Sequence, residues 1–238
     1  MMCARAEAAR LARAMFDRNN NQPPMAGVYP DYAAPIVRTG ADGAREMVDV
    51  RWGMPTSKEV LFEAATRRAD KLRAKGKDID FAELLRLEPD KGTTNIRNLA
   101  SRHWKPWFGV ESRCLVPFTS FSEPDQVGGT LQPIWYALGE NRPLAFFAGI
   151  WKQDHTCVRK IKEGEVICDL FGFLTTAASA EVAVHHSKAM PVILTEPDEW
   201  ETWMTAPWEI ASQLQRPLPD GALNIVARGP RQDLVEPT

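Results

Sequence analysis

The pattern of hydrophobic and polar positions predicts a strand-rich centre flanked by helices. Apolar residues recur at helical spacing over 4–17, and prolines break the chain soon afterwards. Two β-like runs at 36–39 and 47–54 flank an Ala41-Asp42-Gly43 turn, which is typical of a hairpin. Further strands are predicted at 113–121, 134–138, 144–151, 165–175 and 191–194.

Helix formers dominate two other parts of the chain. Residues 57–87 open on Ser57 and contain a Gly76-Lys77-Asp78 break, which predicts two solvated helices. Two more helices are predicted at 199–204 and 208–214, followed by a short apolar run at 223–227. Because strands and helices do not alternate regularly, the pattern favours an α+β fold over a parallel α/β sheet. With no repeat or linker visible, we expect a single domain over 1–238.

Composition places the chain among ordinary globular proteins. It has 238 residues, of which 44% are hydrophobic and 25% charged. Its four cysteines, Cys3, Cys114, Cys157 and Cys168, are too few for the disulfide framework of a small secreted domain. The longest apolar stretch, 145–151, is far too short to cross a bilayer. We therefore expect a cytoplasmic protein with reduced thiols and no membrane partner.

The distribution of charge matters more than its total. The net charge of −2 argues at first against a nucleic-acid partner. Residues 51–122, however, carry 14 basic and nine acidic side chains, a local charge of +5, together with Trp52, Trp104 and Trp107. A groove for single-stranded nucleic acid needs this mixture of basic and aromatic residues, although core tryptophans beside solvated lysines would look the same.

Several common catalytic signatures are absent from the sequence. It has no Gly-rich phosphate loop, no GxSxG, no HExxH and no CxxC, which argues against nucleotide enzymes, serine hydrolases and zinc proteases. His155, Cys157 and Cys168 lack a fourth ligand at a usual zinc spacing. We expect neither a metal nor an organic cofactor.

Four features remain that could carry chemistry: the N-terminal Cys3, the polar cluster at 93–98, the acid Glu123 and the His185-His186 pair. A cysteine that becomes residue one has a thiol and an α-amine that are both partly activated at neutral pH. Toward an aldehyde, it can form an imine and then close through sulfur to a thiazolidine. A carboxylate and an imidazole nearby can move the protons.

These segments resemble the SOS response-associated peptidase family, the SRAP domain proteins, nearly from end to end. The matching pieces are MCAR at 2–5, GVYPDYAAPIV at 27–37, RWGMP at 51–55, TNIRN at 94–98, RCLVPFTSFSEP at 113–124, FAGIW at 147–151, GFLTTA at 172–177, HSKAMPVIL at 186–194 and LQRPLP at 214–219. The resemblance implies a sensor of abasic sites in single-stranded DNA. It implies an autopeptidase that removes the residues before its cysteine and then captures the sugar aldehyde covalently, in a lyase-like reaction.

The resemblance also implies an architecture and a set of site residues. The fold would be a barrel-like, bifurcated sheet surrounded by helices. Cys3 would be the nucleophile, Asn95 would position cysteine and sugar, Glu123 would act as acid and base near the α-amine, and His186 would assist opening of the sugar ring. Four further residues would contact phosphates or lie beside the DNA: Arg5, Arg97, Trp52 and Pro30. Arginine–phosphate contacts give affinity without sequence specificity, which suits a damage sensor.

The sequence departs from the family pattern at two places. It begins Met1-Met2-Cys3-Ala4 where the family usually begins Met-Cys-Gly, so Cys3 becomes the first residue only if both methionines leave or translation starts at Met2. Residues 57–90 match no family motif and are interpreted as a helical insertion. We expect a monomer, associated with the nucleoid when bound to DNA.

Other interpretations of the same residues stay open. Asn95 could be a helix cap, Glu123 an acid in a turn and His186 a buried, hydrogen-bonded histidine. Two other functional classes also fit. One is a thiol peptidase that acts on other proteins, with Cys3 as nucleophile and His186 as base. The other is a non-catalytic nucleic-acid-binding module.

Overall fold

The structure is a computed structural model that describes residues 5–12, 14, 16–17, 25–129 and 131–233. Its helices are α1 (Arg5–Leu11), α2 (Lys58–Arg73), α3 (Phe81–Arg86), α4 (Ala180–Ala183), α5 (Pro197–Thr205) and α6 (Trp208–Ala211). Its strands are β1 (Phe16–Asp17), β2 (Ala33–Thr39), β3 (Arg45–Trp52), β4 (Asn95–Ile96), β5 (Arg113–Phe118), β6 (Phe121–Pro124), β7 (Pro133–Ala137), β8 (Ala145–Val158), β9 (Glu165–Thr176), β10 (Met190–Pro191), β11 (Ile193–Leu194) and β12 (Asn224–Arg228).

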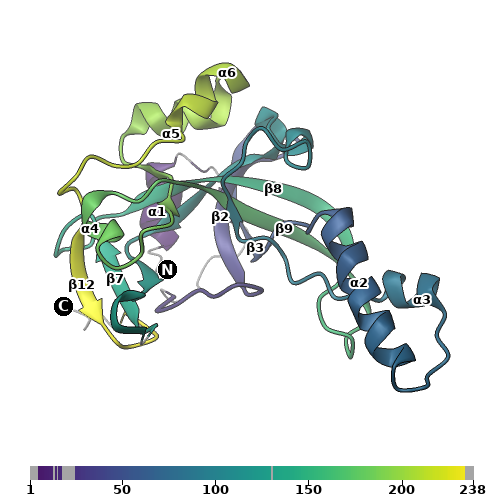
Figure 1. Cartoon of the computed structure of the whole chain (residues 1–238). Helices are drawn as coiled ribbons and strands as arrows, with labels where there is room; N and C mark the ends of the chain where they lie inside the picture. The colour runs from purple at the N-terminus through teal and green to yellow at the C-terminus, as the bar shows by residue number, and fades with distance from the viewer. Residues whose placement is uncertain (1–4, 13, 15, 18–24, 130, 234–238) are drawn as a thin grey trace.

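Five strands close into a barrel at the centre of the molecule (Figure 1). They follow the order β3-β2-β5-β8-β9, and β3 then pairs with β9 in parallel through Arg51↔Leu170 and Trp52↔Phe171. Closure removes the free edges that an open sheet would expose. The predicted α+β fold with a barrel-like sheet is confirmed.

A second, three-stranded sheet, β12-β7-β6, carries Glu123. The single strand predicted at 113–121 is therefore wrong, because β5 ends at Phe118 in the barrel and β6 begins the second sheet. The chain turns between them at Ser120, which is fully buried and donates to Asp233 Oδ2 at 2.8 Å. An apolar run shows that both strands are buried, but it does not show a change of sheet inside the run.

Two more predictions differ from the structure in extent. The helix predicted over 4–17 ends at Leu11, and residues 16–17 pair with β3 instead. The strand predicted at 144–151 continues to Val158, although residues 152–156 are polar. Backbone pairing with β9 carries β8 onward through a register shift between Lys152 and His155, and such pairing needs no apolar side chains.

The predicted hairpin and helix pair agree with the structure. β2 and β3 pair across a turn at Gly43, where φ is +80°. The helices α2 and α3 form an arm that extends from the barrel in Figure 1, and Gly76, at φ +70°, lies between them. The Ser57 side chain caps α2 by accepting from the Val60 N–H. Within the described part of the chain, no helix has the length and apolar character needed to cross a membrane.

Apolar side chains form two packed clusters on opposite sides of the barrel wall. One includes Ile36, Phe118 and Phe147 and continues to Tyr136 of the second sheet. The other joins the barrel to α1, α5 and α6. Trp203 of α5 donates its indole N–H to the carbonyl oxygens of two neighbouring strands. The two clusters hold the barrel rigid, so that the loops and strand ends around it keep fixed positions.

Candidate active site

Glu123 and His186 form a close acid–imidazole pair. Glu123 lies on β6 opposite Ile134, and His186 follows α4, where its backbone N–H donates to Val182 O at 2.7 Å. The distance from His186 Nε2 to Glu123 Oε2 is 3.6 Å. Only 14% of the histidine side chain and 21% of the glutamate side chain are exposed. The structure therefore brings together two predicted site residues that are far apart in the sequence.

Burial shifts the titration of both side chains toward their neutral forms. It raises the pKa of Glu123 from 4.5 to about 7 and lowers the pKa of His186. Because its pKa lies near neutrality, the Glu123 carboxyl group can both accept and donate a proton at physiological pH. This is the property that an acid–base group needs, and the sequence alone does not reveal it.

Tyr136 is a residue near this pair that the sequence interpretation missed. Its ring stacks on Phe121 at 5.6 Å, two residues before Glu123 on β6. The hydroxyl group is buried and has no hydrogen-bond partner among the described residues. An apolar stretch such as PIWYA indicates a core strand, so nothing in the local sequence separates this tyrosine from its neighbours.

Asn95 and Arg97 belong to a segment that contacts the loop after His186. β4 runs parallel to β9, with Asn95 opposite Phe173; the Asn95 side chain is exposed, and the neighbouring Ile96 is buried in the core. The Arg97 guanidinium donates to the backbone carbonyl oxygen of Lys188, two residues after His186. Gln215 fixes the Arg97 backbone by donating to its carbonyl oxygen at 2.7 Å. The strand that carries Asn95 is thus held against the loop that carries His186.

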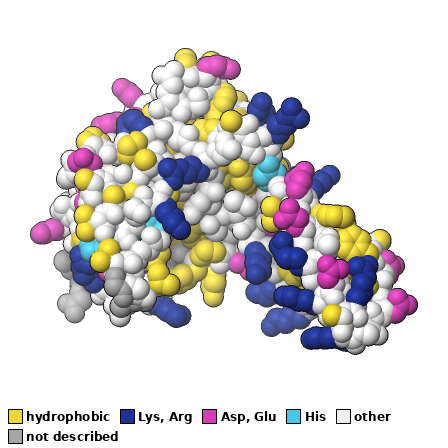
Figure 2. Space-filling view, in the orientation of Figure 1, with side chains coloured by type: hydrophobic (Ala, Val, Ile, Leu, Met, Phe, Trp, Pro, Cys, Tyr) yellow, Lys and Arg dark blue, Asp and Glu magenta, His cyan; other side chains and the backbone are white. Residues whose placement is uncertain are grey.

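Trp52 and Pro30 continue this surface. The Trp52 indole donates to Thr94 O at 3.5 Å, next to Asn95, and its ring packs on Phe173 with a centroid separation of 5.1 Å. Asp31 N donates to Trp52 O at 2.8 Å, which fixes the turn that contains the exposed Pro30. Hydrogen bonds made by these residues or by their sequence neighbours, together with the Glu123–His186 contact, therefore link the segments that carry six predicted residues: Pro30, Trp52, Asn95, Arg97, His186 and Glu123. In Figure 2, basic side chains line both sides of a hollow between the body and the arm.

Two predicted residues cannot be placed in this way. Cys3 lies outside the described residues. Arg5 is the first residue of α1, and its side chain is likewise outside the description. Their roles stay predictions.

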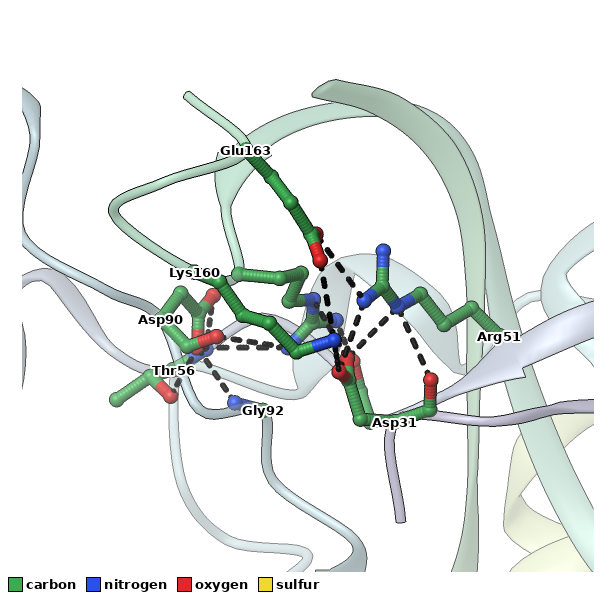
Figure 3. A network of polar contacts seen from close by, with 9 residues as sticks. Asp31, Arg51, Thr56, Asp90, Gly92, Lys160 and Glu163 are labelled. Carbon is green, nitrogen blue, oxygen red and sulfur yellow. Dashed lines mark hydrogen bonds and ion pairs between the residues drawn. The ribbon is translucent and has the colours of Figure 1, made fainter. Parts of the chain in front are cut away.

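A polar network around the buried Arg159 and Asp90 side chains connects the segments that carry this surface (Figure 3). The Arg159 side chain is fully buried and donates to the carbonyl oxygens of Asp90, at 3.0 Å, and Gly53. It also lies 3.8 Å from the Asp31 carboxylate, which Arg51 holds through two hydrogen bonds. Arg159 thereby connects three segments: the one that leads to Asn95, the one that contains Trp52 and the one that contains Pro30.

Asp90 and Gly92 fix the segment that leads to Asn95. The Asp90 carboxylate accepts from the backbone and hydroxyl of Thr56 and from the Gly92 N–H at 2.8 Å. Gly92 has φ +75°, and a Cβ atom there would lie 2.5 Å from Arg159 Nη1. Only glycine fits this position without displacement of the network.

The other cysteines and histidines form no comparable site. Cys114, Cys157 and Cys168 are free, and burial raises the pKa of the Cys114 and Cys157 thiols, the latter to about 11. Cys157 and His155 line a cavity of about 780 Å³ between the base of α2, the 101–107 loop and β8. None of the predicted site residues whose side chains the structure describes lines that cavity. The described residues contain no group of three or more potential metal ligands.

The raised pKa of Glu123 predicts a pH-dependent effect of Glu123→Gln on stability. The Glu123 carboxyl group binds its proton more tightly in the folded state than in the unfolded chain. Its contribution to the free energy of unfolding is therefore fully present below pH 4.5 and is lost as pH rises through about 7. Glutamine keeps the shape without the charge. We expect the free energy of unfolding of the variant to exceed that of the wild type by about 3 kcal/mol at pH 8 and to match it near pH 4.5, as measured by urea unfolding. Glu140→Gln, at an exposed position, is the control. Equal stability of wild type and Glu123→Gln at pH 8 would contradict the prediction.

Comparison with known proteins gives one family and a set of similar folds. A protein-family model described as "SOS response associated peptidase (SRAP)" matches residues 89–227, which begin after α2 and α3. No curated protein matches the chain.

The similar solved structures have low sequence identity and show the fold alone. A crystal structure of a Bordetella bronchiseptica protein has a TM-score of 0.59 and 19% identity, covering 94% of this chain and 93% of that chain. A Bacteroides thetaiotaomicron protein has a TM-score of 0.53 and 19% identity, covering 82% and 72%. A phage-related protein from Bordetella bronchiseptica has a TM-score of 0.54 and 17% identity, covering 85% and 81%.

Proposed function

Because the chain belongs to the SOS response-associated peptidase (SRAP) family, we propose that it captures abasic sites in single-stranded DNA through a covalent bond to Cys3. The observation that carries this proposal is the Glu123–His186 pair, whose carboxyl pKa of about 7 suits proton transfer at neutral pH. The exposed Asn95 and the half-buried Trp52 lie on the adjoining surface, where a strand can reach them.

The proposed reaction begins with maturation of the N-terminus. Self-cleavage of the peptide bond before Cys3 releases the preceding residues and frees the α-amine. That amine adds to the aldehyde carbon of the ring-opened sugar, and the carbinolamine loses water to give an imine. The Cys3 sulfur then adds to the imine carbon while the thiol proton passes to nitrogen, which closes a thiazolidine. Hydrolysis of the peptide bond consumes one water, the capture steps release one, and no oxidant, metal or organic cofactor takes part.

Two groups of the described surface can move the protons that this sequence requires. The Glu123 carboxylate can take a proton from the α-ammonium group and return it to the departing hydroxyl of the carbinolamine. The His186 ring, which burial keeps neutral, can accept the proton of the anomeric hydroxyl as the sugar ring opens. The Asn95 amide can hold a sugar oxygen, and the Arg97 guanidinium can pair with a phosphate.

Incubation with a defined lesion tests this function. Intact mass first establishes that Cys3 is residue one. The protein is then mixed with an oligonucleotide containing a single abasic site and with the same strand carrying an intact base. We expect a heat-stable adduct with the abasic strand alone, at the mass of protein plus strand minus one water. Absence of this adduct from protein that begins with Cys3 would overturn the proposal. Cleavage of an added protein by the same preparation would instead favour the peptidase alternative.

A further inference from the structure

We propose that Tyr32 and Arg231 form a subsite for one nucleotide of the bound strand, with the base stacked on the tyrosine ring and the phosphate paired with the arginine. We call this surface the Tyr32–Arg231 platform. The inference rests on the proposed function for its ligand class, single-stranded DNA.

Tyr32 presents an aromatic ring to solvent from a rigid turn. The turn closes through a hydrogen bond from Tyr32 N to Tyr29 O at 3.1 Å, and Asp31 adopts φ +72° within it. Tyr32 is 63% exposed, and the Tyr29 ring packs edge-on against it at a centroid distance of 6.0 Å. An exposed, oriented ring offers a stacking face for any base.

A concave surface with a free cation adjoins this ring. Tyr29, Tyr32, Pro230, Arg231 and Gln232 line a cavity of about 500 Å³, within the size range of small-molecule sites. Tyr29 Oη donates to the Arg231 backbone carbonyl at 2.5 Å, which joins the two segments. The exposed Arg231 side chain forms no ion pair within the described part of the chain, so it is available to a phosphate.

Both halves of the platform are anchored before any ligand binds. Buried Asp233 accepts two hydrogen bonds from Arg142, at 2.7 and 2.9 Å, and Trp135 donates to Pro230 O at 2.9 Å. On the barrel side, Trp52 N donates to Tyr32 O at 2.9 Å. A preorganised surface loses little conformational entropy on binding, which favours affinity.

The location of the platform indicates which ligand it serves. Trp52 contacts Thr94, beside Asn95, through its side chain and Tyr32 through its backbone, so the platform extends the same row of residues. In Figure 1, the dark purple segment that leads into β2 runs along the bottom of the body, from the β7 side to the lower end of β2. A strand held at Asn95 can therefore continue onto Tyr32. Aromatic and basic groups in one line are typical of single-strand binding.

Binding of an unmodified single strand, measured by fluorescence anisotropy at several salt concentrations, tests the platform. Tyr32→Ala should weaken affinity about tenfold without changing the salt dependence, because it removes stacking alone. Arg231→Ala should lower the slope of log affinity against log salt by about 0.7, the value for one phosphate contact with a single strand. Phe62→Ala and Arg102→Ala, at exposed positions away from the platform, are the matched controls and should match the wild type.

Adduct formation separates the platform from the capture reaction. With subsaturating abasic DNA, Tyr32→Ala should react about tenfold more slowly, and at saturation it should match the wild type. If both platform variants bind like the controls while the wild type forms adducts, the platform is wrong and capture stands. If the wild type forms no adduct but Tyr32→Ala still weakens binding, the platform stands and capture is wrong. If adduct formation by Tyr32→Ala is still slow when abasic DNA is saturating, Tyr32 does more than bind the strand, and the proposal of a binding subsite is wrong.

Discussion

Cys3→Ala is expected to abolish the heat-stable adduct with abasic DNA, a loss on the order of a thousand-fold or more, while affinity for the unmodified strand stays unchanged. The variant is produced so that alanine is already its first residue, because without the Cys3 thiol it cannot be relied on to remove the preceding residues itself. Alanine at residue one then keeps the α-amine but lacks the sulfur that closes the thiazolidine. The variant should therefore stop at an imine, which water hydrolyses. Borohydride should trap that imine as a stable amine and restore a covalent band, whereas an untreated sample should show none.

The remaining cysteines supply the control for this experiment. Cys168 is the most exposed of the described cysteines, yet a mid-chain cysteine has no adjacent α-amine. Cys168→Ala should form the adduct at the rate of the wild type. An adduct from Cys3→Ala without borohydride would mean that the nucleophile lies elsewhere. If neither the wild type nor Cys3→Ala reacts and both bind DNA equally, the protein is a non-catalytic binding module.

The sequence predicts most elements of the barrel because their signals are local. Alternating apolar runs and the Gly43 turn suffice for the β2–β3 hairpin, and Ser57 with a glycine break suffices for α2 and α3. Closure of the barrel depends on Arg51 and Trp52 meeting β9 more than 100 residues later. Period-2 alternation defines which face of a strand is buried, but it does not identify such a distant partner. The two-residue strand β4 has too few positions to show any period.

In the candidate site, too, the sequence predicts the features that depend on local motifs and misses those that depend on the surroundings in space. The motif match predicts Asn95, Glu123 and His186, and the structure brings Glu123 and His186 within 3.6 Å. The pKa of Glu123 depends on what surrounds the carboxyl group in space, which no spacing of residues encodes. Asp90 and Arg159 were missed because a charged residue in a polar stretch ordinarily indicates a solvated surface. Here both side chains are buried.

The second large effect is expected from Arg159→Met, which should lower the free energy of unfolding by about 3–5 kcal/mol. Methionine fills much of the volume, but it leaves the carbonyl oxygens of Asp90 and Gly53 without their donor in the protein interior. The Asp31 and Asp90 carboxylates also lose a buried neighbouring charge. Urea unfolding at neutral pH measures the loss. Arg67→Met is the control, because its ion pair with Glu63 is about two-thirds exposed and should contribute less than about 0.5 kcal/mol.

Arg159→Lys distinguishes the shape of this cation from its charge. Lysine keeps the positive charge but lacks the planar fork that reaches the two carbonyl oxygens together, so it should restore only part of the stability. Because the network fixes the segments next to Asn95 and Trp52, adduct formation at a temperature where the variant stays folded should also slow relative to Arg67→Met. Full stability in Arg159→Met would mean that packing around Gly53 and Gly92 holds these segments without the cation. Full stability in Arg159→Lys would mean that charge alone suffices.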